Sequence, residues 1–217
     1  ISLTSNYIGT IDGGKDMSAV NSFFTKATYK GAVSSSNDWT TGWTLASNAV
    51  QQSETLEGSL TSGTKTLTAN KVYYLTGGYT VKSGATLKIE AGVTVIAKND
   101  NIVDYILIEQ GGKIDAQGTA SSPIVMTSER KEAGAWGGIH ICGYAHTNLG
   151  ATSKSEIGDA TYGGTNDADN SGTLRYIRLE YTGYAFSEEK EANGVSFYGV
   201  GNGTTVEYLQ AYKGSDD

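Results

Sequence analysis

The stretch IEAGVTVIA at residues 89–97 returns in a variant form, IEQGGKIDA, at residues 108–116. A shift of 19 residues, from Ile89 to Ile108, keeps the glycine and the apolar positions of the two stretches in register. Repeats of about twenty residues are typical of solenoid proteins, in which each repeat packs only against its neighbours. The pattern therefore predicts coils in which Ile89 stacks on Ile108.

The repeated unit consists of strands. Leu87 and Ile89 alternate with Lys88 and Glu90, which is the period-two pattern of a strand with one buried face. Further strand-like segments follow without an amphipathic helical segment between them: SPIVMTS (122–128), WGGIHICG (136–143), TLRYIRLEY (173–181), NGVSFYGVG (193–201) and TTVEYLQAY (204–212). The sequence therefore predicts an all-β fold, a parallel β-helix.

The two ends of the chain differ from this pattern. Residues 1–64 are polar and weakly periodic, so we expect an irregular N-terminal cap there, because a solenoid needs its first open edge covered. The β-helix is expected to fill residues 65–217. Since the sequence stops just after a strand, we expect the β-helix to continue beyond residue 217 or its last edge to be covered by something else.

Composition excludes several classes of protein. The formal net charge of −7 argues against nucleic-acid binding, because little positive charge is available to neutralise phosphates. Cys142 is the sole cysteine, so no internal disulfide forms. No apolar run approaches the roughly 20 residues that span a bilayer. We therefore expect a protein without a transmembrane segment.

Several segments, in order, resemble a family of secreted or lipid-anchored β-helix proteins from the outer surface of Gram-negative bacteria. They are AGVTVIA (91–97), AWGGIHICGYAHTNLG (135–150) and YGGTNDADNSGTLRYIRLEYTG (162–183). The resemblance implies a right-handed parallel β-helix on an exported lipoprotein at the outer-membrane surface. The chain departs from the family at His140 and Cys142, where the family usually has apolar residues.

A polar stretch, NDADNSG at residues 166–172, offers a candidate calcium site. Asp167, Asp169, Asn170 and Ser171 supply oxygen atoms at short spacing, and calcium binds six to eight oxygens. The stretch is also typical of a turn that enters a strand. We expect the turn, and keep calcium as a candidate cofactor. The long segment from Tyr144 to Thr173, which contains it, exceeds the usual length of a structural loop.

Three further residues, His140, Cys142 and His146, form an H-x-C-x3-H pattern that could bind zinc. A free cysteine is usually a buried packing residue, and the chain contains two histidines in all. We therefore expect packing at Cys142 and no zinc.

Carbohydrate chemistry has its own candidate residues. Lyases on β-helices use a basic side chain with calcium, and hydrolases use paired carboxylates. Arg175, Arg178, Glu180 and Asp115 are the candidates here, but Arg178 and Glu180 share a strand face and are expected to pair. We therefore expect a non-enzyme, with a lyase or hydrolase as the alternative.

Aromatic residues offer a fourth candidate site. Trp136, Tyr176, Tyr181 and Tyr208 could stack against a sugar, although stacked tyrosines also stabilise a β-helix by themselves. Together these features predict a non-enzymatic surface protein whose β-helix binds glycans or an outer-membrane protein complex for nutrient uptake. An adhesin or structural surface protein is the other alternative.

Overall fold

A computed structural model of the chain describes residues 21–22, 52–69, 71–150, 152–187 and 190–215. The chain divides into two units, Ile1–Gln51 and Gln52–Asp217. All the described strands belong to the second unit, and the described residues contain no helix.

The second unit is a parallel β-helix with three faces. The first face contains β1 (Gln52–Leu56), β4 (Lys71–Leu75), β7 (Thr94–Ala97) and β10 (Ile124–Ser128). The second contains β2 (Ser59–Leu60), β5 (Gly78–Val81), β8 (Tyr105–Ile108), β11 (Ile139–Cys142) and β17 (Val195–Tyr198). The third contains β3 (Gly63–Leu67), β6 (Ala85–Ile89) and β9 (Lys113–Gln117). Each coil thus contributes one parallel strand to each face, which confirms the predicted parallel β-helix.

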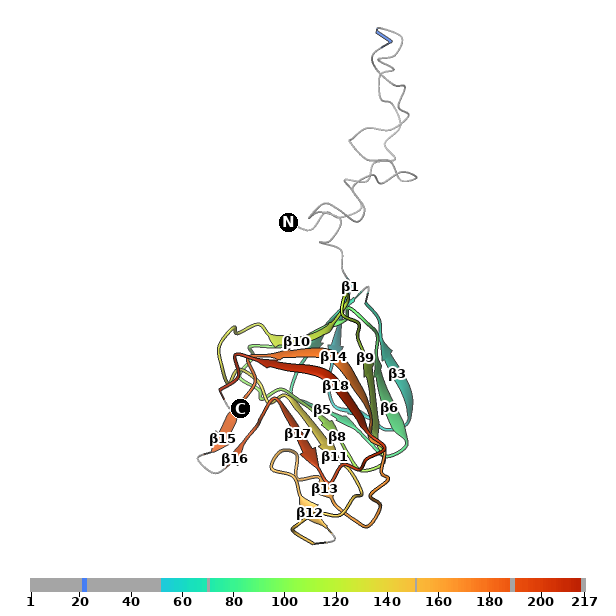
Figure 1. The fold of residues 1–217 in the computed structure, drawn as a ribbon. Helices are drawn as coiled ribbons and strands as arrows, with labels where there is room; N and C mark the ends of the chain where they lie inside the picture. Colours follow the sequence, from blue (N-terminus) through green and yellow to red (C-terminus); the bar gives the residue numbers. More distant parts are fainter. Residues whose placement is uncertain (1–20, 23–51, 70, 151, 188–189, 216–217) are drawn as a thin grey trace. The chain divides into compact units, whose positions relative to one another are not determined.

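Two long strands, β14 (Gly172–Glu180) and β18 (Thr205–Tyr212), each run along two faces of the solenoid. The first part of β14 pairs with β9 on the third face, and its second part pairs with β10 on the first face. Figure 1 shows β9, β14 and β18 side by side. The sequence patterns at 173–181 and 204–212 each predict a single strand. In the structure each of these segments bends at a corner of the solenoid and so runs along two faces.

The predicted stacking of Ile89 on Ile108 is wrong. Ile89 pairs with Leu67 and Ala116 on the third face, whereas Ile108 pairs with Val81 on the second face. The similarity between 89–97 and 108–116 is a similarity between two corners, because each stretch begins at the end of one strand and runs into the next. Stacked residues are separated by variable distances in the chain because the corner loops differ in length.

The core fills the space between the three faces. Leu67, Ile89, Ala116 and Leu174 form one stacked ladder, and each is at most 1 % exposed. Gly172 is required where β14 begins beside β9. Its φ is +123°, and an added Cβ would lie 1.8 Å from the carbonyl oxygen of Ile114. Only glycine allows the two backbones to approach so closely.

The first described coil carries charged side chains at inward positions. Glu54 stands in register with the buried Tyr73, and Lys65 with the buried Leu87, so both charged side chains occupy inward positions. They form an ion pair, and Lys71 Nζ lies 3.3 Å from the second carboxylate oxygen of Glu54. Inward charges are a known device against the addition of another strand at a sheet edge.

Within the described residues the parallel ladder starts at Gln52, so residues 52–64 of the predicted cap carry strands of the solenoid. The rest of the predicted cap, apart from residues 21–22, lies outside the described residues.

Two hairpins project from the corners of the solenoid. β12 (Ser153–Lys154) pairs with β13 (Thr161–Tyr162), and β15 (Ala185–Ser187) pairs with β16 (Lys190–Glu191).

Candidate functional site

The longest loop of the solenoid is an insertion at residues 143–171, between β11 on the second face and β14 on the third. Gln110, in the corner of the preceding coil, forms hydrogen bonds to both ends of the first part of the insertion, residues 143–163. The Gln110 side-chain amide donates to the carbonyl oxygens of Gly143 and Gly163, each at 2.9 Å. Gly163 N also donates to Gly143 O at 2.9 Å, which closes the base of the loop.

The insertion packs against the outer side of the second face. Ala160 and Tyr162 of the insertion form a buried cluster with Leu107 and Cys142, whose side chains point away from the solenoid core. Ser155 stabilises the turn of the hairpin, because its Oγ donates to Ile157 O and accepts from Ala160 N. The insertion is therefore a built, partly buried part of the domain.

A hollow of about 340 Å³ lies between the insertion and the corner that joins β8 on the second face to β9 on the third. We call it the insertion hollow; it is lined by Glu109, Gln110, Tyr144, Lys154, Gly158, Asp159, Ala160 and Thr161. Its volume falls within the roughly 300–1,000 Å³ of small-ligand pockets. Tyr144 is 39 % exposed and is the sole aromatic side chain of this lining.

The polar groups of the insertion hollow are fixed in place. Glu109 accepts a hydrogen bond from Lys82 Nζ at 2.5 Å. Lys154 Nζ donates to Asp159 O and to Thr161 Oγ1 at 3.2 and 3.0 Å. An aromatic ring beside preordered hydrogen-bonding groups is what a sugar ring needs, because its CH face packs on the aromatic ring while its hydroxyls exchange hydrogen bonds.

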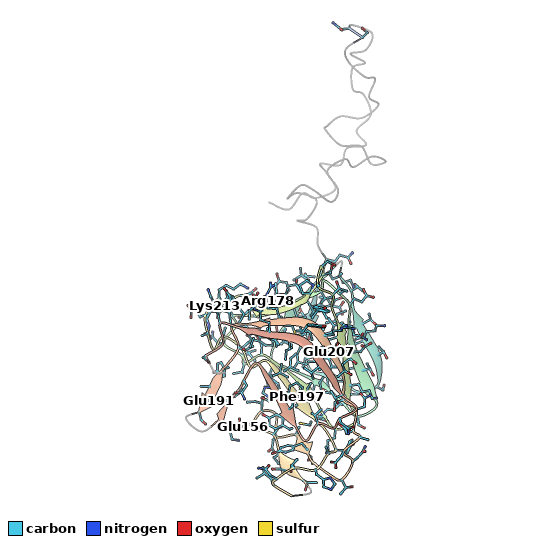
Figure 2. The ribbon with its side chains drawn as sticks, in the orientation of Figure 1. Glu156, Arg178, Glu191, Phe197, Glu207 and Lys213 are labelled. Atoms are coloured by element: carbon cyan, nitrogen blue, oxygen red, sulfur yellow. The ribbon has the colours of Figure 1, made fainter. Side chains whose placement is uncertain are left out.

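A second hollow, of about 350 Å³, lies on the other side of the same hairpin, against the last described coil. It is lined by His146, Thr147, Asn148, Tyr162, Phe197, Tyr198, Gly199 and Val200. Phe197, labelled in Figure 2, comes from β17 and is 43 % exposed. Strand β13 separates the two hollows, since Thr161 lines the first and Tyr162 the second.

The oxygen-rich stretch at 166–171 forms a turn. The Asn170 side-chain oxygen accepts from Gly172 N at 2.9 Å, which is the bond of an Asx turn. Ser171 Oγ donates to the largely buried carboxylate of Asp169 at 3.0 Å. These oxygens are occupied by contacts within the turn.

Asp167 is occupied by a different partner. One of its carboxylate oxygens accepts from both the backbone N and the Nδ1 of His146, at 3.0 and 2.8 Å. These hydrogen bonds, the backbone one first, lower the pKa of Asp167. Within the described ranges no three acidic, His or Cys side chains gather as metal ligands. The contacts of this stretch fit the turn, and calcium binding stays a prediction.

His140 and His146 do not share a site. His140 is fully buried beneath the insertion, where its Nε2 donates to Gly137 O at 2.7 Å and its ring lies against Tyr198. Burial lowers the pKa of His140 to about 4, so the ring is neutral. Burial likewise raises the pKa of the Cys142 thiol to about 11. His140 and Cys142 are packing residues, in contrast to the exposed His146.

Trp136 does not belong to an exposed aromatic surface. It is 1 % exposed, and its indole N–H donates to Glu180 O at 2.8 Å. The sequence predicts a ligand contact at Trp136, but a buried side chain in the core cannot stack against a sugar.

The three predicted tyrosines lie at two different corners. Tyr176 and Tyr208 stack on each other where β14 and β18 turn from the third face to the first. Tyr181 follows β14 at the opposite edge of the first face, beside Tyr212. They therefore do not form one platform.

Comparison with known proteins identifies the domain. Residues 58–217 match the family described as the pectate-lyase-like β-helix domain. The chain belongs to this family. No curated protein and no solved structure matches the chain. Within the described residues no helix is long and apolar enough to cross a membrane.

The first candidate pair for lyase chemistry in this pectate-lyase-like domain is an ion pair on the first face. Arg178 Nε donates to Glu180 Oε1 at 2.7 Å, and Thr127 Oγ1 donates to Glu180 Oε2 at 2.8 Å. Burial alone would raise the pKa of Glu180, but the hydrogen bonds from Thr127 and Arg178 outweigh it and lower the pKa. Glu180 is thus held as a carboxylate with both oxygens occupied.

The remaining lyase candidates are also paired. Arg175 Nε lies 3.1 Å from Glu207 Oε2, and Asp115 Oδ1 accepts from the Gln117 side chain at 2.6 Å. These pairs lie on the wall of the pectate-lyase-like solenoid, away from the residues that line the insertion hollow. Arg175 and Glu207 form a surface ion pair, and Gln117 and Asp115 form a surface hydrogen bond.

Sequence reasoning missed Glu109, Gln110 and Lys154 of the insertion hollow. The length of the segment from Tyr144 to Thr173 pointed to the loop that forms one side of this hollow. Its partners across the hollow are more than thirty residues away in the chain, at a corner whose register the sequence repeat misplaces. Only the true stacking of coils brings Gln110 beneath the insertion.

Proposed function

We propose that this pectate-lyase-like domain is a non-enzymatic glycan-binding protein of the bacterial outer surface. The insertion hollow carries the proposal, because it combines the half-exposed Tyr144 ring with hydrogen-bonding groups that are already held in place. The second hollow across strand β13 gives a longer sugar chain an adjoining surface. A preordered site loses little conformational entropy when it binds.

We further propose that the protein is exported and anchored by a lipid at the outer membrane, and that it acts there beside a nutrient-uptake complex. The support for this setting is the resemblance of the ordered sequence motifs. The test is purification of the protein from native envelopes under mild detergent: co-purification of an outer-membrane transporter supports the role, and recovery without one argues against it.

Affinity electrophoresis against neutral and acidic polysaccharides tests glycan binding. We expect at least one polysaccharide to retard the wild-type protein and to retard Tyr144→Ala less. Tyr212→Ala is the matched control, since Tyr212 is 41 % exposed but lies on β18 outside the hollow. Equal mobility of all three proteins in every gel would contradict the proposal.

A polysaccharide lyase or hydrolase is the second candidate, favoured by the family to which the chain belongs. Incubation of the protein with each retained polysaccharide distinguishes the two functions. New reducing ends or unsaturated products would establish the enzyme. Unchanged polymer together with retardation in the gel is the expected result.

A further inference from the structure

A third hollow lies at the corner between the first and second faces, away from the insertion. Loops of three successive coils stack there: 98–104 after β7, 129–138 after β10, and 181–184 after β14. The hollow has a volume of about 160 Å³ and is lined by Lys98, Asn99, Asn101, Ile102, Val103, Arg130, Ala135 and Tyr184.

The charge of this hollow is opposite to that of the chain. The chain has a formal net charge of −7, yet the lining contains two cations, Lys98 and Arg130, and no carboxylate. Two asparagines add amide groups that can donate hydrogen bonds. A lining of guanidinium, ammonium and amide donors is the chemistry that recognises an oxyanion.

The two cations are incompletely neutralised. Arg130 Nη2 donates to Gly134 O at 3.2 Å, but its buried Nε has no hydrogen-bond partner, and its nearest carboxylate, Glu132, lies 3.9 Å away and is 75 % exposed. Lys98 forms no ion pair with any carboxylate of the described chain; its Nζ lies 5.8 Å from the ring of Tyr74. The Arg130 side chain as a whole is 41 % exposed and lines the hollow, so an oxyanion bound there can neutralise its charge.

The carboxylates of the same loops have other partners. Asp100 accepts from Ile102 N at 3.1 Å, and Glu129 accepts from Asn99 N at 3.1 Å. Asp104 is buried and accepts from Gly77 N at 2.6 Å. These acids accept hydrogen bonds from backbone amides, and none of them lines the hollow, although Asp104 lies close enough to interact with the charge of Lys98.

We propose that this corner hollow binds a small oxyanion group, a sulfate or a carboxylate, with Lys98 and Arg130 as its charged ligands. The volume is below the roughly 300–1,000 Å³ of pockets for whole small molecules, so the hollow suits a single anionic group. This site lies apart from the insertion hollow and does not depend on the glycan-binding proposal.

Backbone-amide NMR titration of the chain tests the proposal at constant ionic strength, with sodium sulfate and sodium glucuronate as probes and sodium chloride as the reference salt. We expect saturable shifts at residues 98–103 and at Tyr184 with at least one probe. Arg130→Gln and Lys98→Gln should each weaken the apparent Kd at least tenfold. Lys88→Gln, which removes an exposed cation on β6, should leave the Kd unchanged.

The two probes distinguish the source of the oxyanion. Saturation with sulfate alone supports a sulfate group, and saturation with glucuronate alone supports a carboxylate. Absence of saturable shifts in these loops with either probe, or an equal Kd in wild type and both cation variants, would overturn the proposal. Two variants are used so that a folding defect in one of them does not decide the outcome.

Discussion

Tyr176 and Tyr208 stack with their ring centroids 4.2 Å apart and their planes inclined by 11°. Each is the single residue at which a long strand turns from the third face to the first, and each has a left-handed backbone, with φ of +49° and +54°. The Arg175 guanidinium lies 5.7 Å from both ring centroids. The corner is therefore held by a cation and two stacked rings in a conformation that favours glycine.

This geometry predicts an unusual order of stability at Tyr176. Both Tyr176→Ala and Tyr176→Gly lose the stacked ring, but glycine adopts the left-handed conformation without the cost of about 1–2 kcal/mol that a Cβ brings. Tyr176→Gly should therefore be the more stable variant by roughly 1 kcal/mol. Urea unfolding of the two variants measures the difference, and a more stable alanine variant would contradict the account of the corner.

The buried carboxyl group of Asp104 should make the stability of the folded protein depend on pH. Burial raises its pKa from 3.8 to about 7, so folding favours the protonated form. The stabilisation is fully present below pH 4 and is lost as the pH rises through about 7. Since one unit of pKa corresponds to about 1.4 kcal/mol, the loss is at most about 4 kcal/mol.

The Asp104→Asn variant isolates this effect because an amide does not titrate. The free energy of unfolding of the wild type, relative to that of the variant, should fall between pH 4 and pH 7 and level off above pH 8. Denaturant titrations at five pH values would measure it. A constant difference over this range would show that Asp104 ionises with an ordinary pKa.

The fold was predictable because strand alternation depends on local residues. Leu87 and Ile89 face the core and Lys88 faces solvent, as the period-two pattern predicts. The register was not predictable from the same residues. A corner sequence such as IEAGV fits a turn between any two faces. The number of residues between stacked positions also varies from coil to coil, because the corner loops differ in length and do not repeat.

The charged N-terminal end of the solenoid predicts a barrier to association. Replacing the inward pair by Glu54→Leu and Lys65→Leu together removes the charges that oppose the addition of another strand at this edge. We expect the double variant to form dimers or larger species in size-exclusion chromatography with light scattering. Lys88→Leu adds an apolar side chain on the outer wall and should stay at the wild-type mass; equal masses for all three proteins would refute the capping role.

The turn at 166–171 predicts the same stability loss with and without calcium. Asn170→Ala removes the side-chain acceptor of Gly172 N, which should lower the free energy of unfolding by about 1 kcal/mol. The loss is expected to be equal in calcium and in chelator. A loss confined to calcium-containing buffer would instead establish the predicted calcium site.

The candidate site shows what a single sequence reveals and what it leaves out. The length of the loop beginning at Tyr144 indicated a functional segment, but the predicted aromatic residue Trp136 is buried beside Glu180. Burial depends on which coils stack above and below a residue. The sequence pattern near Trp136 carries no information on that neighbourhood.

Calorimetric titration with an oligosaccharide of the retained polysaccharide tests the central claim most directly, with wild type, Tyr144→Ala and Tyr212→Ala compared. Because Tyr144 is the aromatic side chain on which the sugar ring is proposed to pack, we expect Tyr144→Ala to bind about tenfold more weakly, which corresponds to roughly 1.4 kcal/mol. Tyr212→Ala should bind as the wild type does. Equal affinity of Tyr144→Ala and the wild type would contradict glycan binding in the insertion hollow.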